Sequence, residues 1–218
     1  GRAAGVEWIH ARTGQHHHGQ ARRVVLCAST IESLRLLLHS QQVGGLEEVS
    51  GLLGQGLMDH VSASCFFALP DQPAPGATEL SGAGSCFIPN TVNLDGAQED
   101  FRRGYGLWTA LQRFDPPALL QRRRGEAVGF LIGHGEVLAD AANRVTLHPE
   151  RRGRWGLPIA HIACRFGDNE HRMLRHMHQR MEQVVAAAGG QIRPIEDLFV
   201  LPLLEPWIKT SLAVGRGA

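Results

Sequence analysis

RRVVLCASTIESLRLLLHS, which spans Arg22–Ser40, is the stretch that best indicates the fold of this chain. Its apolar run Val24–Cys27 predicts a strand buried on both faces of a parallel sheet. Small residues at Ala28–Thr30 make a turn, and their hydroxyl groups are placed to cap the helix that follows. Leucines at helical spacing then predict that helix. A small-residue turn between a buried strand and a helix N-terminus is where α/β folds bind anions and nucleotides.

Length and composition describe an ordinary globular protein. The 218 residues suffice for one large domain or two small ones. The net charge of +1 gives no general electrostatic case for binding nucleic acid or an anionic membrane. No apolar run approaches the length of a membrane span. The four cysteines lie far apart, without a CxxC pair, and are predicted to be buried free thiols.

The residues before Arg22 predict a β-hairpin. Gly5–His10 alternates apolar and polar residues, as a half-buried strand does, and Arg22–Cys27 is its expected partner. The polar segment Arg12–Gln20 between them is predicted to be the loop, with His16–His18 at its tip. A metal site at these histidines is disfavoured, because three successive residues converge poorly on one ion and the loop has no carboxylate or cysteine.

A linker, a glycine-rich block and several strands are predicted next. His39–Glu48 is expected to be a linker, and the glycines of Gly51–Gly56 are expected to allow close backbone approach. The strand candidates that follow have no GxGxxG units between them, which indicates one antiparallel sheet. They are Val61–Leu69, Ser85–Leu94, Phe101–Trp108, Ala127–Val137, Asn143–Leu147 and Trp155–Ile162.

One long helix is predicted after these strands, with Asp168 or Asn169 as its cap and Gly189-Gly190 at its end. Ile192–Leu204 is predicted to be a last strand. The buried face of the helix is expected to consist of Met173, Met177, Met181, Val184 and Ala188. Its three histidines are predicted to face solvent, because they contain no i,i+4 pair and no HExxH motif. They are His171, His176 and His178.

Ser29–Ser40 closely resembles the signature of the FAD-dependent glucose-methanol-choline (GMC) oxidoreductases, which combines small residues, Ser/Thr, Ser-Pro, an apolar pair and Ser-Gly. Two positions depart from it, since Leu34 stands where Pro is usual and Gln41 where Gly is usual. Gly51–His60 resembles the next block of the family, which ends in a similar Leu-x-Asp-His. Further matches follow in the family's order, so the resemblance covers most of the chain. They are Arg103–Gly106, Gly135-Glu136, Asn143–Leu147 and Trp155–Pro158.

The resemblance implies a combined α/β and α+β fold. Residues 1–60 would be part of an FAD-binding Rossmann-like domain, residues 61–208 an antiparallel-sheet substrate domain flanked by helices, and residues 209–218 a truncated C-terminal connection. The family's GxGxxG fingerprint and its late segment with the catalytic His are absent. The chain is therefore expected to be an internal fragment of a longer enzyme, and to be marginally stable or prone to aggregation alone.

The activity that the resemblance implies is FAD-dependent oxidation of the CH–OH group of a sugar or other small alcohol, by hydride transfer to the flavin. Ala28, Ser29 and Thr30 would approach FAD through backbone and hydroxyl groups. Asp59 and His60 would lie near the meeting of the flavin and substrate domains. For this pair, cofactor contact and structural hydrogen bonding both stay open.

Tyr105 and Trp108 would line the substrate pocket, since sugar rings stack on aromatic faces, with ordinary sheet packing as the alternative. No catalytic residue is assigned in the chain, because the family's base is expected beyond its C-terminal end, and no metal ligand is predicted. The electron acceptor is not identified. Two other classes stay open: a flavin-free structural or interaction subunit, and a metal-dependent protein built on the twelve histidines.

Overall fold

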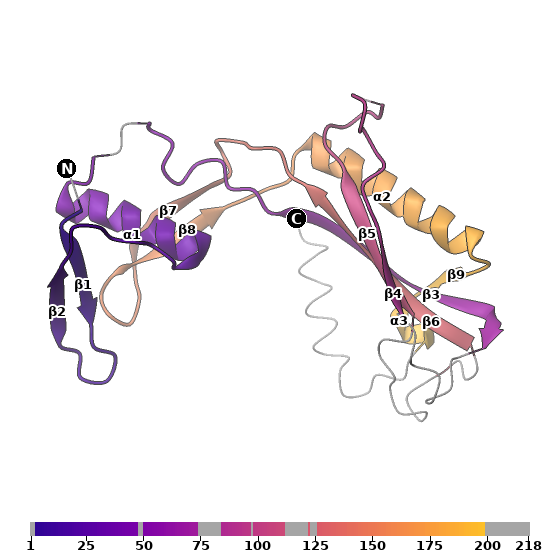
Figure 1. Ribbon diagram of the computed structural model, residues 1–218, viewed down its shortest axis with the longest axis horizontal. Helices are drawn as coiled ribbons and strands as arrows, with labels where there is room; N and C mark the ends of the chain where they lie inside the picture. The colour runs from indigo at the N-terminus through magenta and orange to yellow at the C-terminus, as the bar shows by residue number, and fades with distance from the viewer. Residues whose placement is uncertain are drawn as a thin grey trace. The chain divides into compact units, whose positions relative to one another are not determined.

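The computed structural model describes residues 3–47, 50–73, 84–96, 98–111, 122 and 126–198, which form a mixed α/β structure (Figure 1). The chain divides into two compact units. The first unit comprises Gly1–Met58 and Ala139–Arg165, and the second comprises Asp59–Leu138 and Phe166–Ala218. Their assignment as flavin-binding and substrate domains stays a prediction. No helix in the described ranges is long and apolar enough to cross a membrane.

The first unit contains two β-hairpins and one helix. Its elements are β1 (Gly5–Ile9), β2 (His16–Gln20), α1 (Ser29–Gly44), β7 (Arg144–Arg152) and β8 (Pro158–Ala163). The predicted N-terminal hairpin is confirmed, but its partner strand is wrong. β1 pairs with β2, so His16–His18 lie in a strand rather than at a loop tip. The turn is correspondingly short, and the Gly14 N–H donates to the His10 carbonyl within it.

Arg22–Cys27 is not a strand, and the buried parallel strand predicted there is wrong. Val25 is 81% exposed and Leu26 is 41% exposed. An apolar run becomes a two-sided buried strand only where neighbouring strands and helices cover it. Every strand pair among the described residues is antiparallel, so the first unit provides no such sheet there. The Rossmann-like portion stays a prediction.

Helix α1 starts at the predicted place but without the predicted cap. Ala28 is the N-cap residue, and no side chain makes a capping hydrogen bond. Ser29 has φ +64°, in the left-handed region that non-glycine residues rarely adopt. The helix continues to Gly44, so the linker predicted from His39 is wrong over its first half. Gly45, at φ +64°, ends the helix with its N–H donating to the Ser40 carbonyl.

The glycine-rich block makes the close backbone approach that its composition predicts. Gly54, at φ +81°, accepts a hydrogen bond from the Val145 N–H at 2.7 Å. A Cβ at Gly54 would lie 2.3 Å from the Val145 carbonyl oxygen. Val145 belongs to the hairpin β7–β8, which forms a two-stranded sheet of its own. The prediction that Asn143–Leu147 and Trp155–Ile162 belong to the large sheet is therefore wrong, because this hairpin packs against α1 instead.

The second unit contains the predicted antiparallel sheet, with five strands in the order β4-β5-β6-β3-β9. These strands are β3 (His60–Pro73), β4 (Ser85–Ile88), β5 (Tyr105–Leu111), β6 (Glu126–Glu136) and β9 (Gln191–Arg193). The strand predicted for Ser85–Leu94 ends early, at Ile88. The strand predicted for Ile192–Leu204 is wrong within the described residues. It is limited to β9, a short helix α3 (Ile195–Leu198) follows, and residues 199–204 lie outside the description.

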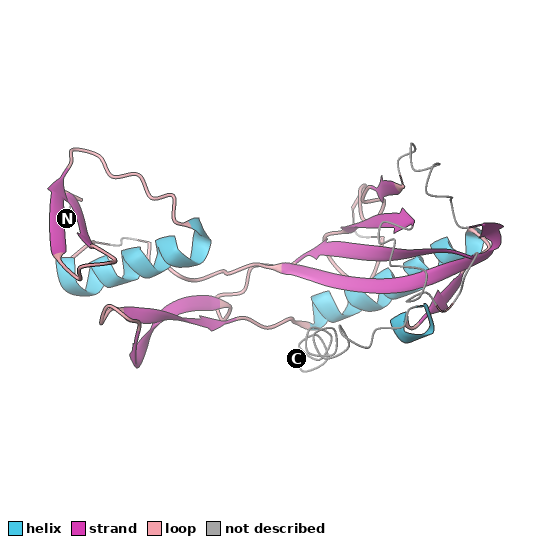
Figure 2. Cartoon of the chain, turned by 90° about the horizontal axis from the view of Figure 1, so that it is seen from below, coloured by secondary structure: helices cyan, strands magenta, loops and turns pink. Residues whose placement is uncertain are grey.

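Helix α2 (Asp168–Ala187) covers one face of this sheet (Figure 2). Met173, Met177 and Met181 are each 0% exposed, which confirms the methionines of the predicted buried face. Val184 is only partly buried, and the prediction is wrong for Ala188, which is exposed beyond the end of the helix. Glycines of β6 allow the helix to approach closely. A Cβ at Gly133 would lie 2.3 Å from the Met177 sulfur. The side chains of this core come from alternate residues of the strands, as in any pleated sheet with one covered face.

The cap predicted for α2 is wrong by one residue at the start. Gly167 is the N-cap residue, and its N–H donates to Glu170 Oε2 at 2.8 Å. Glu170 is only 4% exposed and also accepts the Leu138 N–H at 3.1 Å. A carboxylate inside the first turn is favoured by the unpaired N–H groups and the dipole at that end. It therefore replaces the capping that Asp168 or Asn169 was expected to provide.

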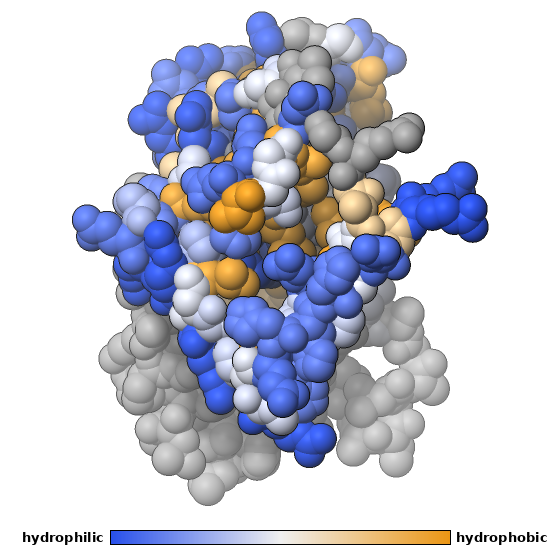
Figure 3. Space-filling model, turned by 90° about the vertical axis from the view of Figure 1, so that its left-hand side faces the viewer, coloured by the Kyte–Doolittle hydropathy of each residue, from blue (hydrophilic) through white to orange (hydrophobic). Residues whose placement is uncertain are grey.

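The two units differ in how much apolar surface they bury. Among the buried hydrophobic residues that the structure describes, Val145 lies in the first unit and all the others lie in the second. Hydrophobic residues interrupt the hydrophilic surface on the side that Figure 3 shows.

The prediction of buried thiols is wrong for three cysteines. Cys27, Cys86 and Cys164 are exposed, Cys65 is partly buried, and all four are free.

Candidate functional site

The face of the large sheet opposite α2 displays exposed polar and aromatic side chains. Because side chains alternate along a strand, every second residue of β3, β5 and β6 points to this face. Helix α3 packs at one end of it, through Leu198 against Ala68 and Val128. We call the remainder the open face, which consists of His60, Ser62, Ser64, Phe87, Trp108, Ile132, His134 and Glu136.

One end of the open face is polar. Ser62 Oγ and His134 Nδ1 are 2.9 Å apart, and the rings of His60 and His134 meet edge to face with centroids 5.8 Å apart. Asp59 turns back to accept the His60 backbone N–H at 2.7 Å. Asp59 and His60 therefore do not form a side-chain pair, and the His134 imidazole stands beside the Ser62 hydroxyl. This end combines hydrogen-bond donors and acceptors on exposed side chains.

An aromatic surface continues from this polar end. Trp108 lies on the open face with its ring edge-to-face on Phe130, centroids 5.1 Å apart. Phe87 stands opposite Trp108 in the β4–β5 register and is 65% exposed. Gly106 leaves space for the Phe87 ring, which a Cβ there would meet at 2.6 Å. A polar group next to an exposed aromatic ring suits a ligand with both hydroxyl groups and C–H faces.

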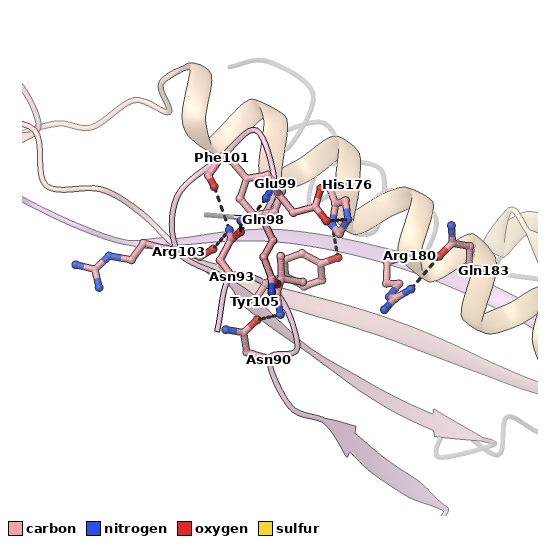
Figure 4. Close-up of polar contacts among 11 residues, drawn as sticks. Asn90, Asn93, Gln98, Glu99, Phe101, Arg103, Tyr105, His176, Arg180 and Gln183 are labelled. Atoms are coloured by element: carbon pink, nitrogen blue, oxygen red, sulfur yellow. Dashed lines mark hydrogen bonds and ion pairs between the residues drawn. The ribbon is translucent and has the colours of Figure 1, made fainter. Parts of the chain in front are cut away.

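Tyr105, the other predicted substrate residue, points to the opposite face of the sheet. It is 5% exposed, and its hydroxyl lies 2.8 Å from His176 Nδ1 (Figure 4). His176 Nε2 is in turn 3.5 Å from Glu99 Oε1. The prediction that His176 faces solvent is therefore wrong, whereas His171 and His178 are exposed as predicted. Burial raises the pKa of Tyr105 to about 12.

Tyr105 also lines a hollow of about 200 Å³ between the sheet and α2. The other lining residues are Ile88, Pro89, Thr91, Leu107, Arg180 and Val184. The two aromatic residues predicted to line one substrate pocket are thus separated by the sheet. Neighbouring positions on a strand share a face only at even spacing, and Tyr105 and Trp108 are an odd number of residues apart.

The five predicted cofactor residues fall into two groups, one in each unit. Asp59 and His60 lie in the second unit at the start of β3. Ala28–Thr30 begin α1 in the first unit, where Ser29 and Thr30 are exposed. A helix start without a side-chain cap offers backbone N–H groups and hydroxyls to an anion or a carbonyl oxygen. These donors fit the phosphate and ring-oxygen chemistry of FAD.

Of the polar residues of the open face, His60 is a predicted site residue and the others were not predicted. The alternation that predicts a strand at Val61–Leu69 also places Ser62 and Ser64 on the side away from Val61 and Ala63. His134 and Glu136 follow from the same period in β6. Within the ranges that the structure describes, no three His, Cys, Asp or Glu side chains are arranged to hold a metal ion.

Comparison with known proteins identifies dehydrogenases among the relatives of this chain. No protein-family model matches it. The chain is 26% identical to the 2-methyl-1,2-propanediol dehydrogenase of Mycolicibacterium austroafricanum over 210 residues, which are 87% of this chain and 38% of that protein. It is 24% identical to the fructose dehydrogenase large subunit of Gluconobacter japonicus over 190 residues, 81% of this chain and 35% of that protein. The chain thus spans little more than a third of the length of each relative, and both are named as dehydrogenases.

Proposed function

We propose that the protein containing this chain oxidises a CH–OH group of a small alcohol or sugar, with FAD as the hydride acceptor. The observation that carries the proposal is the similarity to two dehydrogenases along more than four fifths of the chain. The resemblance of Ser29–Ser40 and Gly51–His60 to the GMC oxidoreductases adds the cofactor to the proposal.

The open face supports a substrate with several hydroxyl groups. One relative is named for a 1,2-diol and the other for a sugar. Such molecules present hydroxyls and C–H faces together. The polar end of the open face, with Ser62 and His134, would hydrogen-bond the hydroxyls. Trp108 and Phe87 would contact the C–H faces, since aromatic rings combine apolar area with an electron-rich surface.

The start of α1 supports the flavin assignment. The positive end of a helix dipole and its unpaired N–H groups stabilise negative charge. Ala28, Ser29 and Thr30 would hold FAD there through backbone and hydroxyl donors. When bound, FAD would accept the hydride from the carbinol carbon, while a base takes the hydroxyl proton. None of the histidines in this chain is proposed as that base.

The test is native purification of the full-length protein. We expect a flavin absorption spectrum that bleaches without oxygen when fructose or propylene glycol is added. Thr30→Glu should lower the ratio of flavin to protein, because its carboxylate repels an anion at the helix start. Gln42→Glu, exposed near the other end of α1, is the matched control and should leave the ratio unchanged. A wild-type protein without bound flavin would disprove the proposal.

A further inference from the structure

We propose that Arg103 and Glu136 act as a clamp that selects substrates with hydroxyl groups on neighbouring carbons. This inference rests on the proposed function and names two specificity residues at the polar end of the open face. Arg103 has φ +68°, in the left-handed region that is unfavourable for a large side chain. Strain of this kind persists where surrounding contacts impose it, and it gathers at functional sites.

The contacts that impose this conformation come first from Asn93. Its Nδ2 donates to the carbonyl oxygens of Arg103 at 2.8 Å and Phe101 at 3.0 Å. Its Oδ1 accepts the backbone N–H groups of Gln98 at 2.8 Å and Glu99 at 3.0 Å. One partly buried amide thus organises the loop between β4 and β5. Figure 4 shows the Arg103 side chain extending away from this network.

Helix α2 holds the same loop from the other side. The Arg102 N–H donates to Asn169 Oδ1 at 2.7 Å, and Arg172 donates to the Asp100 carbonyl at 2.9 Å. Gly104 leaves no room for a Cβ, which would lie 2.3 Å from the Asn90 side chain. The loop is therefore fixed on both sides of Arg103, and the fold sets the backbone position from which its side chain extends.

Arg103 is fixed next to an acidic residue of the open face. Its Nε lies 3.6 Å from Glu136 Oε2, and the two side chains are 64% and 62% exposed. This separation exceeds the roughly 2.7–2.9 Å of a strong charge-assisted hydrogen bond. The Glu136 N–H donates to the Gly104 carbonyl at 3.2 Å, which ties the loop to the end of β6. The pair is thus loose and open to solvent but held in place by its backbones.

The chemistry of the pair suits two adjacent hydroxyls. A guanidinium only donates hydrogen bonds, and a carboxylate only accepts them, whereas a hydroxyl does both. One substrate hydroxyl would accept from Arg103 while its neighbour donates to Glu136. A substrate with a single hydroxyl satisfies only one of the two charged partners. The clamp therefore favours vicinal diols over mono-alcohols.

The experiment compares propylene glycol with n-propanol, which lacks the second hydroxyl, using the full-length flavin-loaded protein. We expect kcat/KM to be higher for propylene glycol by about tenfold or more. Arg103→Gly and Glu136→Gln should abolish this preference, because each removes one of the two partners and kcat/KM for propylene glycol should fall by a larger factor than kcat/KM for n-propanol. Glycine adopts φ +68° without strain, so the melting temperature of the Arg103→Gly variant should not fall below that of the wild type. A change in its substrate preference therefore does not result from unfolding.

Arg102→Gln is the matched control, because Arg102 is the exposed neighbour on the same loop and should keep the preference. Arg103→Lys should keep only part of the preference for propylene glycol, since an ammonium lacks the planar fork of the guanidinium. Equal losses for both alcohols, or a wild type without preference for the diol, would overturn the clamp and leave the proposed function standing. A protein that oxidises no alcohol would overturn both.

Discussion

At the residue scale, Gly54 is a position where the backbone of the first unit tolerates no side chain. Gly54→Ala should lower the free energy of unfolding by about 2–3 kcal/mol, because a Cβ meets the Val145 carbonyl oxygen and φ +81° penalises alanine. Gly51→Ala is the control, since Gly51 has φ +69° but no atom within 4 Å of its added Cβ. It should cost only about 1 kcal/mol. Urea unfolding measures both values, and equal costs would show that the close approach is unimportant.

Tyr105 makes a second prediction, because it is the single tyrosine of the chain. Burial raises its pKa from 10.0 to about 12. A raised pKa means that the folded state holds the proton more tightly, so this stabilisation is complete below pH 10 and is lost as the pH approaches 12. Its size is at most about 2–3 kcal/mol.

Tyrosinate absorbance, titrated in the folded and the urea-unfolded chain, measures this pKa directly. Tyr105→Phe should remove this part of the alkaline loss of stability. It should also cost about 1 kcal/mol at neutral pH, because the hydrogen bond to His176 is lost. A folded-state midpoint at 10.0 would contradict the buried position of the hydroxyl.

At the element scale, the start of α2 depends on Glu170. Burial raises the pKa of this carboxyl, but hydrogen bonds from the Leu138 and Gly167 N–H groups and from Asn169 outweigh it, so the net pKa is lowered from 4.5. The stabilisation is therefore present above pH 4.5 and is lost as the pH falls through the lower folded-state pKa.

Glu170→Gln should reduce the loss of unfolding free energy at acid pH, and it should cost about 1–2 kcal/mol at neutral pH. Urea unfolding at neutral pH and across the acid range measures both effects. Glu182→Gln, exposed on the same helix, should change neither quantity and serves as the control. An unchanged acid slope in Glu170→Gln would show that another carboxylate is responsible.

The elements differ in how far the sequence predicts them. Helix α2 is predicted well, because the spacing of its methionines identifies both the helix and its buried face. Arg22–Cys27 is predicted badly, because a short apolar run carries no period that separates a buried strand from an exposed loop. The hairpin partner was missed for a related reason. His16–His18 has no alternation, and only the pairing with β1 makes it a strand.

The candidate site depends on register, which the sequence conveys only in part. Once β3 and β6 are aligned, their alternation brings Ser62, His134 and Glu136 to one face. The conformation of Arg103 cannot be predicted in this way, because it depends on Asn93 in its own loop and on Asn169 in α2. Contacts between residues far apart in the chain determine that loop, and no local period reports them.

At the scale of the whole molecule, the two units should differ in stability. α1 has no buried residue, and Val25 and Val43 are 81% and 72% exposed in the first unit. The second unit buries a continuous core in which the α2 methionines pack against β3 and β6. Burial of apolar area is the dominant favourable term in folding, so the second unit should open at a much higher free energy than the first.

Hydrogen exchange measured by segment tests this difference. Amides of β3 and β6 should exchange through global unfolding, whereas those of β1, β2, β7 and β8 should exchange faster through local opening. Met177→Ala should cost about 2–4 kcal/mol and raise exchange rates in the second unit. If the units unfold independently, the first unit will keep its own exchange rates in that variant. Equal protection in both units, or exchange rates that rise throughout the chain in Met177→Ala, would instead show that the two units unfold as one cooperative structure.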